Sequence, residues 1–203
     1  METTNDLPWL IRDLLNARSP KAIERPGTAF RHAAVLIPLF RTASEYRILF
    51  TKRTDKVEAH KGQISFPGGK IEEEDASPLE TALREADEEI GLLRKDVTVL
   101  GQMDAARTVS SNYIVHPFVG LIPYPYDFKI SVQEVEELLE VPFHVFLSGD
   151  SGGGNASVVY GGGAYQSLAY YYRGEVIWGA TARIMQNLVE PVKRKLGLPV
   201  ENR

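Results

Sequence analysis

The chain contains no cysteine, so disulfide bonds, thiolate metal sites and thiol catalysis are excluded. This absence fits a reducing compartment. The sequence also lacks any run approaching the ~20 apolar residues that a membrane-spanning helix needs. Its first residues, METTNDLPWLIRDLL, lack the charged start and apolar core of a signal peptide. We therefore expect a cytoplasmic protein that does not bind membranes. The net charge of −4 argues against a nucleic-acid-binding surface, because such surfaces are usually basic.

The 203 residues are 43% hydrophobic, which suits one packed domain. Strands are expected where β-branched and aromatic residues gather, and helices where apolar residues recur at helical spacing. The expected strands are 30–40, 46–53, 62–66, 96–103, 114–122, 156–160, 165–172 and 175–178, and the expected helices are 6–17, 78–90 and 179–195. Residues 131–148 are expected to form a polar loop and helical turns, and the glycine runs 152–154 and 161–163 to form loops of a β-meander. This mixture predicts an α/β layered domain.

The segment from Ser77 to Gly91 has clear helix start and stop signals. Ser77 is a good N-cap residue, Pro78 fits the first turn and Glu80 completes a capping box, while Gly91 marks the end. At ~100° per residue, the apolar side chains form one stripe: Leu79, Ala82, Leu83, Ala86 and Ile90. The helix can therefore bury one side and present its other side at a cleft.

Acidic residues crowd the other side of this helix. Residues 72–89 carry nine carboxylates, and Glu85, Glu88 and Glu89 have the i, i+3, i+4 spacing that places them on one face. A solvated face usually alternates charges, whereas only Arg84 is near enough in sequence to compensate for this cluster. Such repulsion indicates a bound cation, and carboxylate oxygens suit Mg²⁺ or Mn²⁺, which often bridge to phosphate. The pattern predicts a metal-dependent enzyme that acts on phosphate compounds.

The segment READEEIGL, residues 84–92, resembles the second half of the Nudix box, G-x5-E-x7-R-E-U-x-E-E-x-G-U with U apolar, and Gly69 matches its first glycine. The resemblance implies the Nudix fold, a mixed β-sheet between α-helices. It also implies that Glu85, Glu88 and Glu89 hold the metal ions with help from the backbone carbonyl of Gly69. The expected organisation is an N-terminal helix and linker over 1–27, a Nudix domain over 28–195 and a tail over 196–203.

The spacing of the box departs from the family pattern in one place. Gly69 and Arg84 are fifteen positions apart, whereas the strict pattern has fourteen. One residue is inserted in the loop, so either Glu74 or Asp75 takes the place of the first glutamate. In the family that position braces the loop, so the metal ligands themselves are unaffected.

Residues 49–69, LFTKRTDKVEAHKGQISFPGG, resemble the signature L-L-T-x-R-(S/A)-x3-R-x3-G-x3-F-P-G-G of the coenzyme A diphosphatase subgroup. The segment IWGATAR at 177–183 is also similar to this subgroup, so the resemblance extends over roughly 30–190. Glu58 stands where the pattern has arginine, and this charge reversal keeps other substrates open. The expected substrate-binding residues are Lys52, Arg53, His60, Gly68 and Gly69, since arginine grips phosphate bidentately and lysine offers a point charge.

Two further groups of residues lie outside the box. Some Nudix enzymes place a general base on a loop beyond it, and Glu134 is the candidate in this chain, with an ordinary solvated helix start as the alternative. Trp178 and the tyrosines of 169–172 are candidates for an adenine-stacking wall, with ordinary packing as the alternative.

The residues and the resemblance together predict a hydrolase that cleaves coenzyme A to 3′,5′-ADP and 4′-phosphopantetheine with Mg²⁺ or Mn²⁺. Either Glu85 or Glu134 would take the proton from the attacking water. A second hypothesis keeps the chemistry but assigns a dinucleotide or a nucleotide sugar as substrate. A third is a nucleotide-binding sensor without turnover. A homodimer is compatible with all three.

Overall fold

The computed structural model describes residues 6–23, 30–54, 62–108, 112–148, 152–160 and 162–200. The elements in chain order are α1 (Leu7–Asn16), β1 (Arg31–Arg41), β2 (Tyr46–Arg53), β3 (Ile64–Ser65), β4 (Gly68–Lys70), α2 (Pro78–Ile90), the 3₁₀ helix η1 (Arg94–Asp96), β5 (Thr98–Gln102), β6 (Ala106–Arg107), β7 (Tyr113–Leu121), β8 (Val135–Pro142), α3 (Phe143–Leu147), β9 (Gly152–Tyr160), β10 (Gly163–Tyr172), β11 (Glu175–Trp178) and α4 (Gly179–Lys195).

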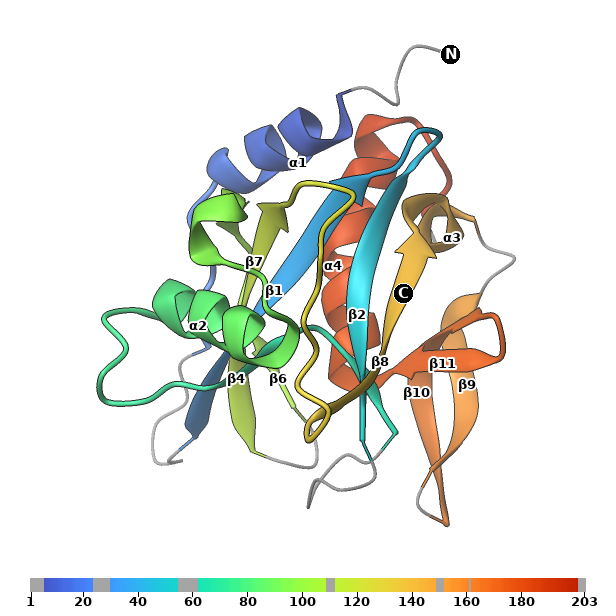
Figure 1. Cartoon of the computed structure of the whole chain (residues 1–203). Coiled ribbons are helices and arrows are strands. Elements are labelled where there is room, and N and C mark those ends of the chain that lie inside the picture. The colour runs from blue at the N-terminus through green and yellow to red at the C-terminus, as the bar shows by residue number, and fades with distance from the viewer. Residues whose placement is uncertain are drawn as a thin grey trace.

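A mixed β-sheet forms the centre of the fold (Figure 1). Its main path is β3-β2-β1-β7-β5, and β4, β6 and β8 pair with β1, β7 and β2. β1 and β7 run parallel over 31–39 and 113–121, whereas the other pairs in this sheet are antiparallel. A separate antiparallel sheet, β9-β10-β11, lies beside β8 and leads into α4.

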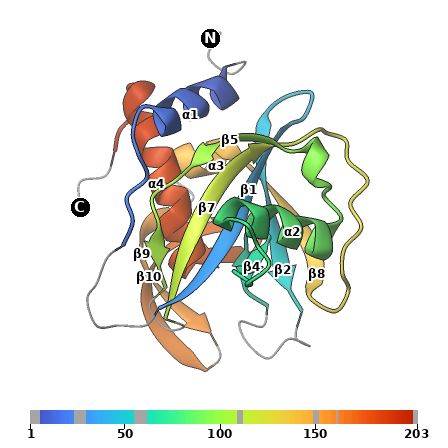
Figure 2. The same ribbon diagram turned by 90° about the vertical axis from the view of Figure 1, so that its left-hand side faces the viewer.

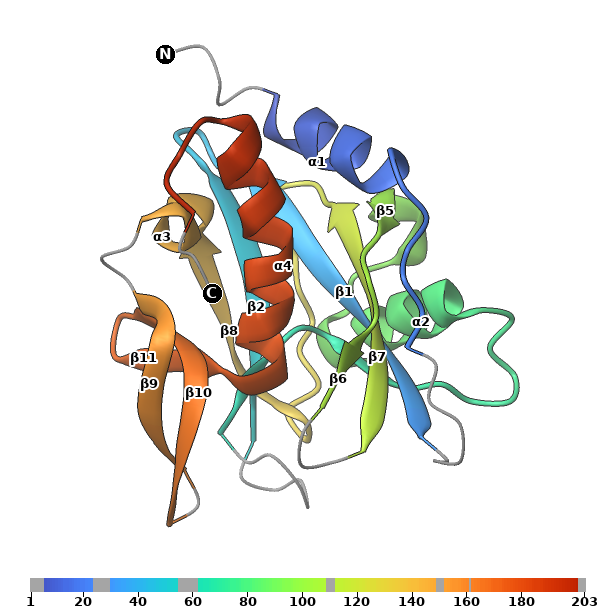
Figure 3. The ribbon, with the colours of Figure 1, turned by 180° about the vertical axis from the view of Figure 1, so that it is seen from behind.

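Both faces of the central sheet are covered, because successive side chains of a strand point to opposite faces. Leu36 and Phe40 of β1 pack with the apolar stripe of α2, while Ile37 and Leu39 pack with α1 and α4. Figures 2 and 3 show the same layers, with α2 on one side of the sheet and α4 crossing the other. This arrangement confirms the expected α/β sandwich.

Most of the expected elements are present, including the helix from Pro78 to Ile90 and the three-stranded meander. The expectation for 131–148 was wrong over its central part. Residues 135–142 form β8, which pairs with β2, although Glu and Leu have good helix propensity. Tertiary pairing with a buried strand outweighs that local preference.

The glycine-rich segments also differ from expectation. Gly152–Gly154 belong to β9 and pair with β10, rather than forming a loop. Gly68 and Gly69 form β4 on the edge of β1, rather than only a turn. Gly68 has a φ of +152°, and a Cβ there would lie 2.3 Å from the Ala34 carbonyl oxygen. A side chain at this position would therefore break the pairing. Gly161 lies outside the described residues.

Among the described residues, no helix has both the length and the apolar character required to span a bilayer.

Candidate active site on helix α2

Helix α2 starts and ends where its sequence signals predicted. The Ser77 hydroxyl accepts a hydrogen bond from the Glu80 amide at 3.3 Å, and Gly91 closes the helix with a φ of +67°. The capping box is only half formed, because the Glu80 carboxylate pairs with Arg94 instead of turning back to Ser77. These caps fix the start and end of the helix that carries the three box glutamates.

Asp75 braces the loop before α2. Its carboxylate accepts two hydrogen bonds from Arg84, each at 3.0 Å, and further bonds from the Thr81 hydroxyl at 2.8 Å and the Glu72 amide at 3.0 Å. The Arg84 guanidinium holds the pKa of Asp75 well below its usual range, and Asp75 in turn raises the pKa of Arg84. Glu74 is exposed. Asp75 therefore occupies the bracing position that spacing alone left open between these two residues.

Arg84 also contacts two of the box glutamates. One of its terminal nitrogens lies 3.0 Å from both Glu85 Oε1 and Glu88 Oε2. The Glu85 side chain is 15% exposed, whereas that of Glu88 is 57% exposed. Burial raises the pKa of Glu85 and the nearby Arg84 charge opposes that rise. The guanidinium therefore supplies part of the positive charge that these carboxylates need.

Glu89 is the most buried member of the cluster, at 3% side-chain exposure. It is thus enclosed rather than presented at an open cleft, as the helical pattern alone suggested. One oxygen accepts a hydrogen bond from the Gly68 amide at 3.3 Å, and the other lies 3.6 Å from an Arg53 nitrogen. Burial raises the pKa of Glu89 to about 8; Arg53 opposes this rise, and the Glu85 charge adds to it. A carboxylate in this position has a strong physical preference for either a proton or a cation.

Gly69 lies directly against the cluster. A Cβ at this residue would be 2.3 Å from Glu85 Oε1, so a side chain here would displace the Glu85 carboxylate. The preceding Gly68 donates its amide to Glu89. The two glycines predicted at the site therefore lie beside the carboxylates of Glu85 and Glu89.

Glu134 comes from the loop that precedes β8. The Ser131 amide donates to the Glu89 carbonyl at 2.8 Å, and the Thr54 amide donates to the Glu134 carbonyl at 3.0 Å, which ties this loop to the end of α2 and to β2. The charge of Glu134 contributes to the raised pKa of both Glu85 and Glu89. The carboxylate of Glu134 therefore lies near those of Glu85 and Glu89. Glu134 directly precedes strand β8, rather than a helix.

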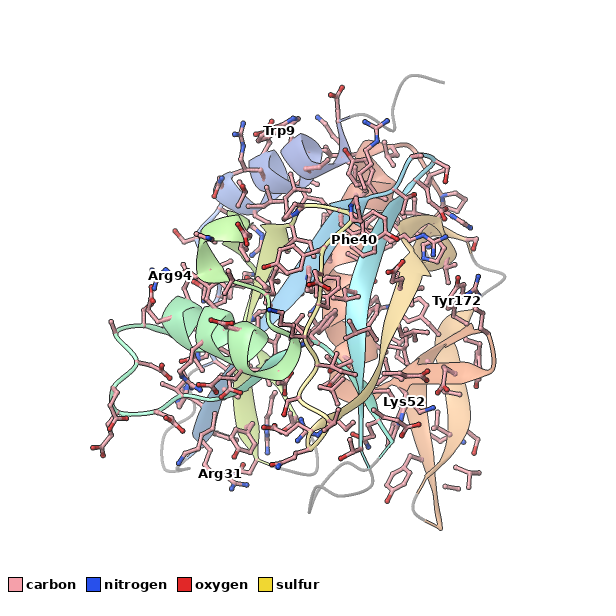
Figure 4. All side chains as sticks on the ribbon, viewed as in Figure 1. Trp9, Arg31, Phe40, Lys52, Arg94 and Tyr172 are labelled. Carbon is pink, nitrogen blue, oxygen red and sulfur yellow. The ribbon has the colours of Figure 1, made fainter. Side chains whose placement is uncertain are left out.

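Lys52 belongs to a different cluster. Its ammonium group lies 2.7 Å from Glu175, 3.2 Å from Glu137 and 3.7 Å from Glu136, and the pKa of Lys52 is raised chiefly by Glu175. Because neighbouring side chains of a strand point to opposite faces of the sheet, the Lys52 side chain reaches Glu175 whereas the Arg53 side chain reaches Glu89. Figure 4 shows Lys52 at the boundary between β2, β8 and the three-stranded sheet. Its charge is neutralised there, away from the box glutamates. His60 lies outside the described residues.

Divalent cations suit this donor set. Glu85 and Glu89 offer hard carboxylate oxygens, and because burial raises both pKa values, Mg²⁺ or Mn²⁺ would stabilise their charged forms. In the described part of the chain no three His, Cys, Asp or Glu side chains converge as a ready metal cage. The contacts of Arg84 explain this, because they turn Glu85 and Glu88 toward the guanidinium.

Two contributors were not predicted in these roles. The sequence marks Arg84 only as a charge-compensating neighbour, yet it connects Asp75 to Glu85 and Glu88. Thr81 was not singled out, yet it is fully buried and donates to Asp75. The sequence could have indicated this role only through the position of Thr81, a polar residue beside the apolar stripe of the helix.

Comparison with known proteins agrees with this geometry. The NUDIX domain family model matches residues 30–147. The uncharacterized Nudix hydrolase NudL of Yersinia enterocolitica is 40% identical over 167 residues, covering 79% of this chain and 81% of that protein.

Solved structures share the fold at low sequence identity. The Nudix hydrolase RenU from M. smegmatis superposes with a TM-score of 0.53 at 16% identity, covering 85% of this chain and 90% of that one. A MutT/nudix family protein from Enterococcus faecalis superposes with a TM-score of 0.54 at 12% identity, covering 94% of this chain and 69% of that one. From the domain match, the 40% identity and the shared fold, we conclude that this chain belongs to the Nudix hydrolase family.

Proposed function

We propose that this protein hydrolyses the diphosphate linkage of coenzyme A or its derivatives, giving 3′,5′-ADP and 4′-phosphopantetheine. The observation that carries hydrolysis of a diphosphate is the pair of carboxylates Glu85 and Glu89, whose side chains are 15% and 3% exposed and lie against Gly69 and Gly68. The support for coenzyme A as substrate is the signature at 49–69 with the segment 177–183.

Glu85, Glu88 and Glu89, with the Gly69 carbonyl, are the proposed metal ligands. Nudix hydrolases generally use divalent ions such as Mg²⁺ or Mn²⁺, which neutralise phosphate oxygens and lower the pKa of bound water. Arg84 must then yield its contacts with Glu85 and Glu88, while its bidentate bond to Asp75 keeps the loop in place.

Glu134 is our proposed general base, because Glu85 is already a proposed metal ligand and the charge of Glu134 acts on both Glu85 and Glu89. A water oxygen forms a bond to one phosphorus, the bond from that phosphorus to the bridging oxygen breaks, and Glu134 accepts the water proton. The bridging oxygen leaves with the other phosphate. Arg53 is our proposed phosphate-binding residue, and its nitrogen 3.6 Å from Glu89 supports this proposal.

The test is turnover of coenzyme A with Mg²⁺ in ¹⁸O-labelled water, followed by mass spectrometry of both products. We expect 3′,5′-ADP and 4′-phosphopantetheine, with the label on one product only. The Glu89→Gln variant should lose this activity, and the exposed Glu74→Gln variant should keep it. Wild-type activity in Glu89→Gln would contradict the ligand assignment.

A second candidate substrate is another nucleoside diphosphate derivative, and the charge reversal at Glu58 favours it. Competition between coenzyme A, NADH and ADP-ribose separates the two candidates. Preferential hydrolysis of NADH or ADP-ribose would replace coenzyme A as the substrate while leaving the chemistry intact. Binding of these compounds without hydrolysis in Mn²⁺ would instead indicate a sensor.

A further inference from the structure

Two aromatic side chains meet on one face of the three-stranded sheet. The rings of Tyr165 on β10 and Trp178 at the end of β11 have centroids 5.5 Å apart and are tilted by 34°. Ala169 of β10 is the cross-strand partner of Trp178, and Tyr165 lies four residues earlier on the same face. The Tyr165 ring also lies over Gly163, where a Cβ would be 3.1 Å from its hydroxyl. We call Tyr165 and Trp178 the aromatic platform.

The aromatic platform faces away from the core. The alternate residues of the same strands, Tyr170 and Ile177, are buried in the cluster formed with α3 and α4. Tyr165 remains 47% exposed. A half-exposed aromatic side chain beside a second ring offers a flat ligand a stacking surface.

The three-stranded sheet is attached to the strand that leads into the site. β11 contacts β3, and the Glu175 carboxylate of β11 holds Lys52 at 2.7 Å, next to the pairing of Lys52 with Ile64 of β3. From Ser65 at the end of β3 the chain reaches Gly68 in three residues, at most about 10 Å of extended chain. Figures 1 and 3 show the β9–β10 hairpin projecting at the same end of the molecule as β4.

The location of the platform suggests a role in substrate choice. The NUDIX domain match ends at residue 147, so β9, β10 and β11 lie beyond the part that carries the box. A nucleobase joined to a diphosphate can stack on aromatic side chains, and Tyr165 and Trp178 place two neighbouring aromatic rings on one face of this sheet. Base–aromatic stacking contributes about 1–3 kcal/mol per base.

We propose that Tyr165 and Trp178 stack the nucleobase of the diphosphate substrate. This inference rests on the proposed function, since it takes the substrate to be a nucleoside diphosphate derivative. It adds that the nucleotide half extends toward the three-stranded sheet, whereas the non-nucleotide half has no contact with the platform.

Tryptophan fluorescence tests the platform without any reaction. The chain has two tryptophans, and Figure 4 places the other, Trp9, on α1 at the opposite end of the molecule from Lys52. In a Trp9→Phe background, ADP should quench Trp178 emission and 4′-phosphopantetheine should leave it unchanged. Tyr165→Leu should weaken ADP binding about tenfold. Tyr171→Leu is the matched control, because Tyr171 lies on the same strand and is also 47% exposed.

Kinetics provide the second readout. Trp178→Leu should raise KM for the nucleoside diphosphate substrate about tenfold with little change in kcat, and Trp178→Phe should restore most of the loss. Turnover of coenzyme A or ADP-ribose with no ADP-dependent change in Trp178 emission would overturn the platform alone. Quenching by ADP with no hydrolysis of any nucleotide would retain the platform and overturn the proposed function. Trp178 emission that changes with protein concentration, and not with ADP, would assign this face to contact between copies and overturn the proposal.

Discussion

Two clusters in this molecule place several glutamates around a basic side chain, and they differ in burial. Around Lys52, Glu136 and Glu137 are about half exposed and the ammonium group neutralises them in contact with water. On α2, the side chains of Glu85 and Glu89 are only 15% and 3% exposed, and burial raises both pKa values although nearby arginines oppose the rise. The first cluster is a surface ion-pair network that joins strands. The second lacks positive charge, which makes it suitable for metal ions. Burial, rather than the number of carboxylates, distinguishes them.

The largest expected effect comes from removing the charge of Glu89 in the α2 cluster. Glu89→Gln should lower kcat about 100-fold or more, because it removes a buried metal ligand. The same variant should raise the metal-free free energy of unfolding at pH 8 by about 1–3 kcal/mol, because an uncompensated buried charge is lost. Steady-state kinetics and urea unfolding measure the two effects.

Glu137→Gln is the control for this comparison, since it makes the same chemical change beside Lys52. Its activity should stay within about twofold and its stability within about 1 kcal/mol, as for an exposed ion pair. Equal losses in the two variants would remove the distinction between the clusters.

The brace at Asp75 should be the next most sensitive position. Asp75→Asn removes the bidentate partner of Arg84, and we expect the free energy of unfolding to fall by about 2–3 kcal/mol. Activity should fall as well, because the freed Arg84 competes for Glu85 and Glu88. Urea unfolding of this variant beside Glu74→Gln checks the assignment, which would fail if Glu74→Gln were the more destabilised of the two.

The pH dependence of stability provides a third comparison. The folded pKa of Glu89, about 8, is higher than its ordinary value of 4.5, so the folded state retains a proton that the unfolded state has lost. Stability in chelator should therefore fall as the pH rises from about 5 to 8. Mg²⁺ should reduce this slope by replacing the proton. Thermal melts across this range should show the full slope in wild type and Glu137→Gln and a smaller slope in Glu89→Gln, where the raised pKa of Glu85 remains. A slope unchanged in Glu89→Gln would show that another group causes it.

The smallest expected effect is at Lys52. Lys52→Gln leaves three carboxylates without their cation and should destabilise the fold by about 1 kcal/mol, more at low salt than at high salt. Turnover at saturating substrate should stay near wild type, because Lys52 does not contact the box glutamates. A large fall in kcat with unchanged stability would show instead that Lys52 takes part in binding the phosphates, as the sequence predicted.

The box helix was readable from sequence because its signals are local. Ser77, Gly91 and the spacing of Glu85, Glu88 and Glu89 fix both the helix and its acidic face. The identity of the brace was not readable, since Glu74 and Asp75 are adjacent acids, and only the three-dimensional path of the loop brings Asp75 to Arg84.

The prediction for the segment that forms β8 was wrong, and the partners of Lys52 were not predicted, for a related reason. The segment 135–142 has helix-forming residues, and its pairing with β2 depends on a contact far away in sequence. Lys52 and Arg53 look equivalent as neighbouring cations, but the partners of Lys52 come from β8 and β11, which the motif does not contain. Burial of Glu89 likewise depends on Gly68 and Arg53 from other strands.

The hydrogen bond from the Ser131 amide to the Glu89 carbonyl has a mechanical consequence. The backbone of a proposed metal ligand and the loop that presents the proposed base are joined through one short link, with a second from the Lys129 amide to the Ile90 carbonyl. A displacement of the helix end therefore carries Glu134 along with Glu89. The distance between these two proposed catalytic residues would therefore change little if the end of α2 moved.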